Sequence, residues 1–322
     1  MATFLVTGGC GFIGSHLCAA LAADGHGVRV LDDLSTGSEA NLAPGAELLR
    51  GDVADPGAVR DAVAGVDGCF HLAAVASVER GTRDWLETHR TNLSGTVAVF
   101  EAARPHASGG AGAAGGTPVV YASSAAVYGD CAALPLDEEA PTRPLSAYGA
   151  DKLGCELHAR VAGRVHSVPT LGLRFFNVFG PRQDPRSPYS GVISIFCDRL
   201  SRGERLDVFG DGGQTRDFVF VGDVVAALAA AMPAASPAAP VFNVCTGRPT
   251  SVLDLAAAVA GLSGSGLELR HMPARAGEIR HSVGSPARAR QALGFEPRFG
   301  LRGGLEAVLA WNRSGRPGLA GR

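Results

Sequence analysis

The chain has 322 residues, of which 46% are hydrophobic and 19% are charged. This length exceeds what one small hydrophobic core supports, and the composition is typical of a globular protein rather than a disordered one. The formal net charge of −2, without a dense run of lysine and arginine, argues against nucleic acid or an anionic membrane as a partner.

The cysteines and histidines indicate neither a disulfide framework nor a metal site. The seven cysteines are scattered without any C-x-x-C spacing, and the nine histidines show no metal-ligand spacing. The N-terminal segment lacks the basic region of a signal peptide, and no apolar run is long enough to span a bilayer. We therefore expect a soluble protein in the cytoplasm.

Short apolar runs alternate with helical stretches in the first half of the chain. Strands are expected at residues 4–6, 28–31, 47–49, 69–72 and 119–121, with an amphipathic helix at 13–23. Strands separated by helices pair in parallel through right-handed crossovers. The sequence therefore predicts an α/β fold with a Rossmann-like, doubly wound parallel sheet.

The regular alternation of strands and helices is interrupted in the second part of the chain. The glycine- and alanine-rich stretch 107–117 is interpreted as a flexible surface insertion at the sheet edge opposite the ligand. After about residue 177, proline-rich turns lead to a helix near 192–203. A strand and helix over 217–232 and a strand at 241–245 are expected to return to the sheet. The remainder from residue 247 is expected to form a smaller lid, with a frayed tail after Trp311.

A glycine-rich turn follows the first strand directly. Residues 7–14 read Thr-Gly-Gly-Cys-Gly-Phe-Ile-Gly and place Gly8, Gly11 and Gly14 in GxxGxxG spacing. Gly8 permits a tight turn, Gly11 lets the backbone approach a pyrophosphate, and Gly14 lets the helix pack on the strand. The helix that starts around Phe12 and Ile13 offers free N–H groups to phosphates. Ordinary turn chemistry is the alternative, but the strand before and the helix after favour dinucleotide binding.

Acidic residues follow the next two strands. Asp32 and Asp33 end the second strand, where an acid accepts hydrogen bonds from the adenine ribose and repels a 2′-phosphate. This favours NAD over NADP, although a plain turn residue is the alternative. Asp52 and Val53 follow the third strand, where a carboxylate would meet the adenine amino group.

The fourth strand is followed by small side chains. Leu72, Ala73 and Ala74 would permit close approach of a cofactor. His71 before them is interpreted as a packed or backbone-bonded histidine rather than a catalyst. Cys10 in the glycine-rich turn is interpreted as a small filling residue.

Tyr148 and Lys152 are four residues apart, on one face of a helix. A surface pair is the alternative, but Ser123 and Ser124 at the end of the fifth strand would face this helix. A tyrosine's ordinary pKa of about 10 is too high for a base at neutral pH, and one positive charge about 4 Å away is worth roughly three pK units. With Lys152 and an oxidised nicotinamide beside it, Tyr148 would act as general base, and Ser124 would orient the hydroxyl being oxidised.

These motifs, with residues 173–181 (Leu-Arg-Phe-Phe-Asn-Val-Phe-Gly-Pro), resemble the extended short-chain dehydrogenase/reductase family over nearly the whole chain. Within it the chain is most similar to the UDP-hexose 4-epimerases. The resemblance implies an NAD-binding Rossmann domain at 1–176, with returning segments at about 217–246, and a smaller C-terminal α/β substrate-binding domain at 177–216 and 247–322. It also implies tightly held NAD, a UDP-sugar substrate and a homodimer built from the helices at 92–104 and 148–163.

The resemblance also assigns further site residues. It places Asn92, Ser123 and Phe176 at the cofactor, Asn177, Arg216 and Arg275 on the sugar-nucleotide diphosphate, Glu278 on the ribose, and Val192 and Phe209 around the uracil. Ser77, Ser124 and Ser282 complete the implied substrate residues. Glu278 departs from the aspartate usual there, and a structural pairing of Arg216 with Asp217 is the alternative to the diphosphate clamp.

The residues after Ser124 discriminate between reactions of the family. Its dehydratases carry an Asp-Glu pair there and its decarboxylases a Glu, whereas this chain has Ala125 and Ala126, neither of which can move a proton. The resemblance therefore implies oxidation at C4, reorientation of the keto sugar and return of the hydride to its other face. The predicted enzyme is an NAD-dependent nucleotide-sugar 4-epimerase, an isomerase.

Ser282 bears on the choice of substrate. It lies seven residues after Arg275. In the epimerases that the chain resembles, the residue at this position borders the 2-substituent of the sugar, and a small residue there admits an N-acetyl group. The stretches 73–78 and 182–185 also resemble epimerases of N-acetylated sugars. UDP-GlcNAc/UDP-GalNAc is therefore expected, with UDP-glucose/UDP-galactose beside it. A UDP-glucuronate 4-epimerase, a keto-sugar reductase that releases its cofactor each cycle, and a non-enzymatic dinucleotide sensor are the alternatives.

Overall fold

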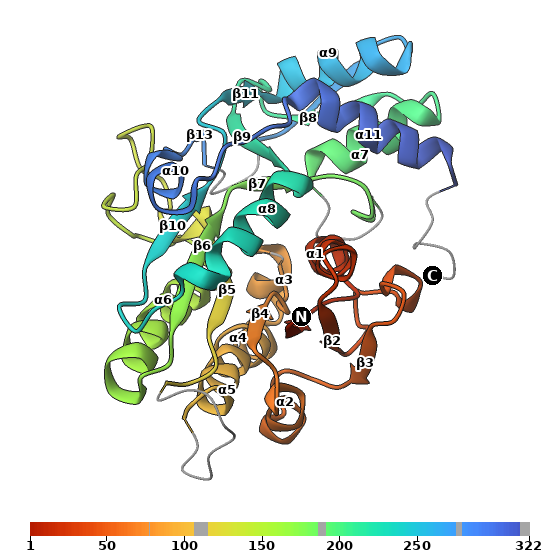
Figure 1. Ribbon diagram of the computed structural model, residues 1–322. Coiled ribbons are helices and arrows are strands. Elements are labelled where there is room, and N and C mark those ends of the chain that lie inside the picture. The colour runs from red at the N-terminus through yellow and green to blue at the C-terminus, as the bar shows by residue number, and fades with distance from the viewer. Residues whose placement is uncertain (77, 106–114, 186–190, 275–278, 316–322) are drawn as a thin grey trace.

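A seven-stranded parallel sheet forms the centre of the molecule (Figure 1), in a computed structural model that describes residues 1–76, 78–105, 115–185, 191–274 and 279–315. The strand order is β10-β6-β5-β4-β1-β2-β3. The strands are β1 (Thr3–Thr7), β2 (Gly27–Asp32), β3 (Glu47–Arg50), β4 (Gly68–His71), β5 (Val119–Ser124), β6 (Thr170–Phe175) and β10 (Val241–Val244). Each neighbouring pair is parallel, which confirms the predicted fold class and the five strands expected in the first half.

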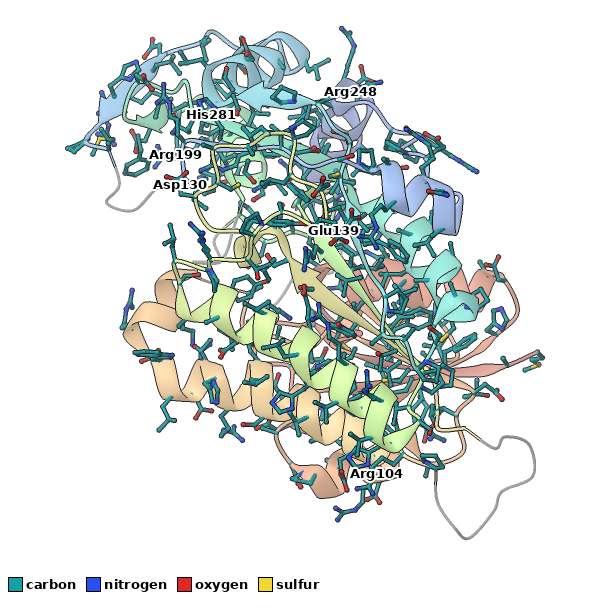
Figure 2. The ribbon with its side chains drawn as sticks, turned by 90° about the vertical axis from the view of Figure 1, so that its left-hand side faces the viewer. Arg104, Asp130, Glu139, Arg199, Arg248 and His281 are labelled. Atoms are coloured by element: carbon teal, nitrogen blue, oxygen red, sulfur yellow. The ribbon has the colours of Figure 1, made fainter. Side chains whose placement is uncertain are left out.

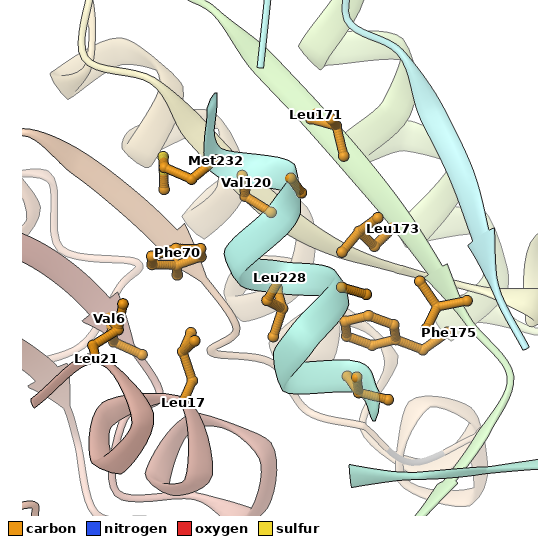
Figure 3. Packing of buried hydrophobic residues seen from close by; sticks show 14 of the residues in the cluster. Val6, Leu17, Leu21, Phe70, Val120, Leu171, Leu173, Phe175, Leu228 and Met232 are labelled. Atoms are coloured by element: carbon orange, nitrogen blue, oxygen red, sulfur yellow. The ribbon is translucent and has the colours of Figure 1, made fainter. Parts of the chain in front are cut away.

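Helices cover both faces of this sheet. On one face, α1 (Phe12–Ala23) and α8 (Val221–Ala231) pack side by side. Figure 3 shows Leu228 of α8 between the sheet residues Phe70 and Leu173, with Leu17 of α1 nearby. On the other face, α2 (Pro56–Val63), α5 (Gly95–Ala102) and α6 (Ala147–His166) form a second apolar layer. Both faces are therefore buried, as a parallel sheet requires.

Local signals explain the limits of α6. The Ser146 hydroxyl accepts a hydrogen bond from the Gly149 amide at 3.1 Å, which satisfies one of the free amides of the first turn. The helix ends where Ser167 takes the left-handed conformation at φ 57°. Beside α6 lie α3 (Val78–Arg83), α4 (Trp85–His89) and a π-helical turn (Arg90–Ser94) that continues into α5.

A second core lies beyond the carboxyl edge of the sheet, in the upper part of Figure 1. Its four-stranded sheet consists of β7 (Asn177–Phe179), β9 (Thr215–Phe220), β11 (Pro249–Ser251) and β13 (His281–Ser282), and β8 (Leu206–Phe209) pairs with β12 (Leu269–Met272). Three helices pack on these strands, namely α7 (Val192–Ser201), α9 (Val252–Ser263) and α11 (Leu301–Arg313). The short helix α10 (Ala287–Leu293) contacts β10 and α8.

One expected strand does not join the main sheet. The strand near residue 217 was expected to return there, but β9 pairs with β7, β11 and β13 instead. The reason is that β7 turns away from the main sheet directly after β6 and offers β9 a parallel partner, while β10 takes the edge beside β6. The helix α8 and the strand β10 do return to the main sheet as expected.

Asp217 joins the two cores. Its carboxylate is fully buried and accepts hydrogen bonds from the amides of Thr246 at 2.7 Å, Gly247 at 2.8 Å and Gly284 at 3.3 Å. Arg216 donates instead to the carbonyl of Thr215. The Asp217 carboxylate is thus used to hold β9 against the loops that follow β10 and β13.

Candidate functional site

A cavity of about 320 Å³ lies at the carboxyl ends of β1, β2 and β4. The crossover from β1 leads to β2 on one side of it, and the crossover from β3 leads back to β4 on its other side, so the strand order reverses at β1. Ligands bind at such a point in doubly wound sheets. Twelve of the predicted cofactor residues line this cavity: Gly8, Gly11, Phe12, Ile13, Gly14, Asp32, Asp33, Asp52, Val53, Leu72, Ala73 and Ala74. The other five, Asn92, Ser123, Tyr148, Lys152 and Phe176, are not among the lining residues.

The glycine-rich turn has the close packing that requires glycine. Gly8 has φ +71°, and a Cβ there would lie 2.8 Å from the Ala73 nitrogen. A Cβ on Gly14 would lie 2.2 Å from the Gly8 carbonyl oxygen, so only glycine lets α1 start here. Gly11 caps α1 without a side-chain hydrogen bond, and the first amides of the helix remain available to a phosphate.

Asp32 holds the two loops that border the cavity. Its carboxylate accepts from the Cys10 amide at 2.9 Å and from the Leu34 amide at 2.8 Å, and the residue is buried. Burial, followed by the Asp32 charge, raises the pKa of Cys10 to about 12. The Cys10 thiol therefore stays protonated, which fits a packing role. The contact of Asp32 with an adenine ribose stays a prediction.

Asp33 and Asp52 have protein partners at the rim. Asp33 accepts from the amide and hydroxyl of Ser35 at 2.9 and 2.7 Å. Asp52 forms an ion pair with Arg90 at 2.5 Å, and Arg90 also pairs with Glu87 at 2.9 Å. The predicted contact of Asp52 with an adenine amino group therefore has to coexist with this ion pair.

Buried polar groups hold the loop after β4 in place. The amides of Leu72 and Ala73 donate to the Thr7 hydroxyl at 3.1 and 3.2 Å, which leaves the proton of that hydroxyl for His71 Nδ1 at 2.8 Å. His71 Nε2 faces Thr96 Oγ1 at 3.0 Å, and Thr96 donates in turn to the Asn92 carbonyl. These bonds require neutral His71 with its proton on Nε2.

Asn92 is hydrogen-bonded to the same loop through its side chain. Its side-chain amide exchanges two hydrogen bonds with the backbone of Val75, at 2.8 and 3.1 Å, and the residue is fully buried. In this structure Asn92 therefore acts on the cavity through the loop 72–76, five residues of which line it.

Tyr148, Lys152 and Ser124 lie at the junction of α6 and β5. Lys152 Nζ donates to the carbonyl of Ala122 at 2.9 Å and lies 5.8 Å from the centroid of the Tyr148 ring. Ala122 itself lines the cavity, so this lysine is attached to the cavity wall. Ser124 Oγ accepts from the Ala126 amide at 3.1 Å, and this leaves the hydroxyl proton of Ser124 available to a ligand. Tyr148 is partly buried.

The neighbouring Ser123 is bound into a buried ionic cluster. Its hydroxyl donates to Glu156 Oε1 at 2.6 Å, and Glu156 forms a bidentate pair with Arg174 at 2.8 and 2.7 Å. Arg174 also donates to the hydroxyl of Tyr128 at 2.8 Å. The Ser123 hydroxyl is thus committed to the protein interior, and its predicted contact with a cofactor stays a prediction.

Phe176 lies just beyond β6. It packs in a small apolar cluster with Val127, Tyr128, Leu136 and Cys245, and its ring centroid is 6.4 Å from that of Tyr128. Its predicted contact with the cofactor likewise stays a prediction.

The small sheet collects three of the predicted substrate residues. Ser282 of β13 pairs with Arg216 of β9, and Asn177 of β7 pairs with Phe218, two residues further along β9. Since side chains alternate along a strand, this register puts Asn177, Arg216 and Ser282 on the same face. Val192 begins α7 and Phe209 ends β8. Ser77, Arg275 and Glu278 lie outside the described residues, as does most of the stretch 107–117 and the tail from residue 316.

Several cavity residues carry no local sequence signal. The lining residues that sequence patterns did not assign to the cofactor include Ser35, Thr36, Ser38, Asn41, Arg80, Glu87, Arg90, Thr91, Arg182 and Gln183. Most come from loops and from α3 and α4, where nothing in the spacing points to the cavity. Within the described part of the chain there is no group of three or more His, Cys, Asp or Glu suited to a metal ion. None of the described helices combines the length and the apolarity needed to cross a membrane.

The switch-point cavity, the glycine-rich turn and the acid at the end of β2 define a dinucleotide-binding α/β protein. The sequence profile of the NAD dependent epimerase/dehydratase family matches residues 4–245. The chain therefore belongs to this family, and NAD is its cofactor. The cavity fits that group, because glycines leave room for a phosphate next to α1 and the carboxylate of Asp32 lines the cavity at the end of β2.

Individual relatives extend the likeness over almost the whole chain. UDP-glucose 4-epimerase of Mycolicibacterium smegmatis is 39% identical over 321 residues, covering 96% of this chain and 98% of the relative. A UDP-N-acetylglucosamine 4-epimerase from Methanobrevibacter ruminantium, in complex with UDP-N-acetylmuramic acid, superposes with a TM-score of 0.90 at 31% identity, covering 98% and 99%. The Thermus thermophilus UDP-glucose 4-epimerase in complex with NAD superposes with a TM-score of 0.88 at 34% sequence identity, and the match covers 97% of this chain and 99% of that one.

Replacing His71 by asparagine should make the stability of the protein less sensitive to acid. Burial, with a smaller contribution from the Lys152 charge, lowers the pKa of folded His71 to about 3, against about 6.5 in an unfolded chain. Below about pH 6.5 the unfolded chain binds a proton that the folded chain excludes, so stability falls as the pH falls. Between pH 7.5 and 5.0, denaturant unfolding should show a loss about 2 kcal/mol larger in the wild type than in the variant.

The substitution His158→Asn, at an exposed position of α6, is the matched control and should leave the pH dependence unchanged. Parallel pH profiles for the wild type and His71→Asn would contradict the neutral state assigned to His71.

Proposed function

We propose that this chain is an NAD-dependent UDP-hexose 4-epimerase, which oxidises the sugar at C4 and reduces the keto group from the other face. The observation that supports the proposal is the hydrogen bond from Lys152 Nζ to the carbonyl of Ala122, which lines the cofactor cavity. Tyr148 precedes Lys152 by four residues on α6, and Ser124 ends the strand to which Ala122 belongs. NAD, when bound, accepts the hydride and returns it. The names of the relatives support the same reaction.

The side chains divide the proton chemistry among them. Tyr148 takes the proton of the C4 hydroxyl as general base. It gives a proton back to the C4 oxygen after the keto sugar has reoriented in the site. Lys152, held by the Ala122 carbonyl, keeps a positive charge beside the ring, which stabilises a phenolate. Ser124 can donate its hydroxyl proton to the sugar oxygen, because its bond with the Ala126 amide is one in which the hydroxyl oxygen accepts.

The turn after β5 favours epimerisation over elimination. Residues Ala125–Val127 form a single 3₁₀ turn, and Ala125 and Ala126 supply no acid or base there. A 4-keto sugar formed at this site lacks a group in that turn to drive loss of water or carbon dioxide, so the return of the hydride is the remaining outcome.

The reaction is tested by incubating the protein separately with UDP-GlcNAc, UDP-glucose and UDP-glucuronate, with NAD in catalytic amount, and following the C4 proton by NMR. We expect interconversion of the C4 epimers of UDP-GlcNAc and UDP-glucose. Tyr148→Phe should lower kcat by at least about 100-fold, the usual contribution of a general base, while the protein keeps its NAD.

Other outcomes separate the alternatives. Turnover of UDP-glucuronate alone would favour the uronate epimerase. Stoichiometric consumption of NADH with a keto sugar would favour a reductase. Unchanged kcat in Tyr148→Phe would contradict the proposed catalytic role.

We further propose UDP-GlcNAc and UDP-GalNAc as substrates, beside the 2-hydroxy sugars. Ser282 is small and projects from the same face of the small sheet as Arg216, the residue proposed to hold the diphosphate. A sugar attached to that diphosphate has its ring next to the same face. A serine there leaves room for an N-acetyl group at C2.

Ser282→Tyr should discriminate between the two kinds of sugar. A phenol in place of a hydroxymethyl group fills the space that the N-acetyl group needs, so kcat/KM for UDP-GlcNAc should fall by at least about 10-fold, and that for UDP-glucose by less than about 3-fold. The conservative Ser282→Ala should leave both values near those of the wild type. Equal losses for the two sugars in Ser282→Tyr would contradict the assignment.

We also propose that the protein is a homodimer through α6, as expected from the sequence, and through α4 in place of the expected helix at 92–104. Large apolar side chains are exposed on these neighbouring helices, namely Trp85, Leu86, Leu157, Val161 and Val165. Leu86 is 82% exposed and Val165 66% exposed, and the three α6 residues recur every four positions, which places them in one stripe. Figure 2 shows α6 lying along the surface of the molecule. A second copy of the same face would bury this stripe in an isologous interface.

Val161→Glu, in the middle of the stripe, should convert the dimer to a monomer in sedimentation velocity, because it would bury an unpaired carboxylate at the interface. Leu267→Glu, at an exposed position between α9 and β12, is the control and should sediment like the wild type. An unchanged dimer in Val161→Glu would contradict the proposed interface.

A cytoplasmic location is proposed as well. All seven cysteines are free thiols, six of them buried, and thiols persist in reducing compartments.

A further inference from the structure

A segment from the second core reaches back to the start of α1. It follows β7 and begins with Gly180 and Pro181. The carbonyl of Pro181 accepts a hydrogen bond from His16 Nε2 at 2.9 Å, and His16 lies one turn after Phe12, the first residue of α1. This bond fastens the segment to the helix whose first amides face the cavity.

Arg182, the next residue, lines the cavity together with Gly11 and Phe12. Its φ of +67° is in the left-handed region, which a non-glycine residue adopts at some cost and which recurs at functional sites. Burial lowers the pKa of His16, the hydrogen bond to Pro181 opposes this, and the charge of Arg182 lowers the pKa further. Arg182 therefore stands at the wall of the cavity that the first residues of α1 also line.

Among the residues that the structure describes, no carboxylate forms an ion pair with the guanidinium of Arg182. Its Nη1 is buried and has no hydrogen-bond partner among the described residues, and burial lowers the pKa of the side chain. A buried cation of this kind is costly unless an anion pairs with it. The other charged lining residues differ, since Arg90 pairs with Asp52 and Glu87, and Arg80 lies 3.7 Å from Asp84.

Acidic side chains outnumber basic ones among the residues that line the cavity, so a cation at its wall matters for the binding of an anionic ligand. Five carboxylates line it against three arginines: Asp32, Asp33, Asp52, Glu87 and Asp184 against Arg80, Arg90 and Arg182. An anionic ligand is therefore repelled unless a positive group stands where its own charge lies. The N-terminus of α1 supplies part of that charge, and Arg182 stands beside it.

We propose that Arg182 binds the diphosphate of NAD, and that the segment 180–184 is a strap by which the second core holds the cofactor in place between half-reactions. The planar guanidinium offers two parallel donors to a phosphate, in the same cavity that the glycine-rich turn and the first residues of α1 line. His16 is then a positioning residue, which acts through Pro181. The proposal concerns cofactor retention and is independent of which sugar the protein converts.

The test measures ligand binding rather than turnover. Purified Arg182→Gln should retain less NAD per chain after dialysis than the wild type. In titrations of protein stripped of NAD, the dissociation constants for NAD and for ADP should both rise about 10- to 100-fold, the usual effect of removing a hydrogen bond to a charged group. Binding of adenosine, which has no phosphate, should be unchanged. Arg182→Lys keeps the positive charge but lacks the two parallel N–H donors of a guanidinium, so its affinity for NAD and ADP should lie between those of the wild type and Arg182→Gln.

Arg104→Gln is the matched control. Arg104 pairs with Glu101 and lies at the end of the molecule away from the second core, as Figure 2 shows. This variant should bind all three ligands like the wild type. Wild-type affinity for NAD and ADP in Arg182→Gln would overturn the proposal. An equal loss of adenosine and ADP binding would overturn it too, because it would mean that the variant alters the cavity as a whole. Thermal unfolding of each variant verifies that the chain remains folded.

Discussion

The position of Lys152 depends on one hydrogen bond, from its Nζ to the carbonyl of Ala122. Ala122 belongs to β5 and lines the cavity, whereas Lys152 belongs to α6, so this bond attaches the helix that carries the proposed catalytic pair to the wall of the cavity. One helical turn further along α6, Glu156 binds Ser123 of β5 and Arg174 of β6. Because the ion pair of Glu156 and Arg174 is buried, removing one partner would leave an uncompensated charge, and the junction tolerates little displacement.

The cavity is assembled by polar groups that need not touch a ligand. Asp32 holds the loops at Cys10 and Leu34, Thr7 and His71 hold the start of the loop after β4, and Asn92 holds its middle. Each of these groups is buried and hydrogen-bonded, so the shape of the site is set before a cofactor arrives. Preorganisation of this kind suits a cofactor that stays bound while the substrate changes.

The second core adds what the parallel sheet lacks. Its small sheet presents Asn177, Arg216 and Ser282 on one face, and Asp217 ties that sheet to the loops after β10 and β13. The segment after β7 runs back to α1, where His16 receives it. The second core is therefore connected to the main sheet by the buried carboxylate of Asp217 and to α1 by the segment that carries Arg182.

The sequence by itself determined the parallel sheet and the glycine-rich turn, because alternating apolar runs and GxxGxxG after a strand are local patterns. The four-residue spacing of Tyr148 and Lys152 on a helix is also local, and their catalytic role stays a prediction. Family resemblance added most of the substrate residues. Only the tertiary structure decided that β9 joins the small sheet, that Arg90 pairs with Asp52, and that Arg182 enters the cavity. These features depend on pairings between segments far apart in the chain, which are chosen by the packing of the whole molecule and leave no trace in local periodicity.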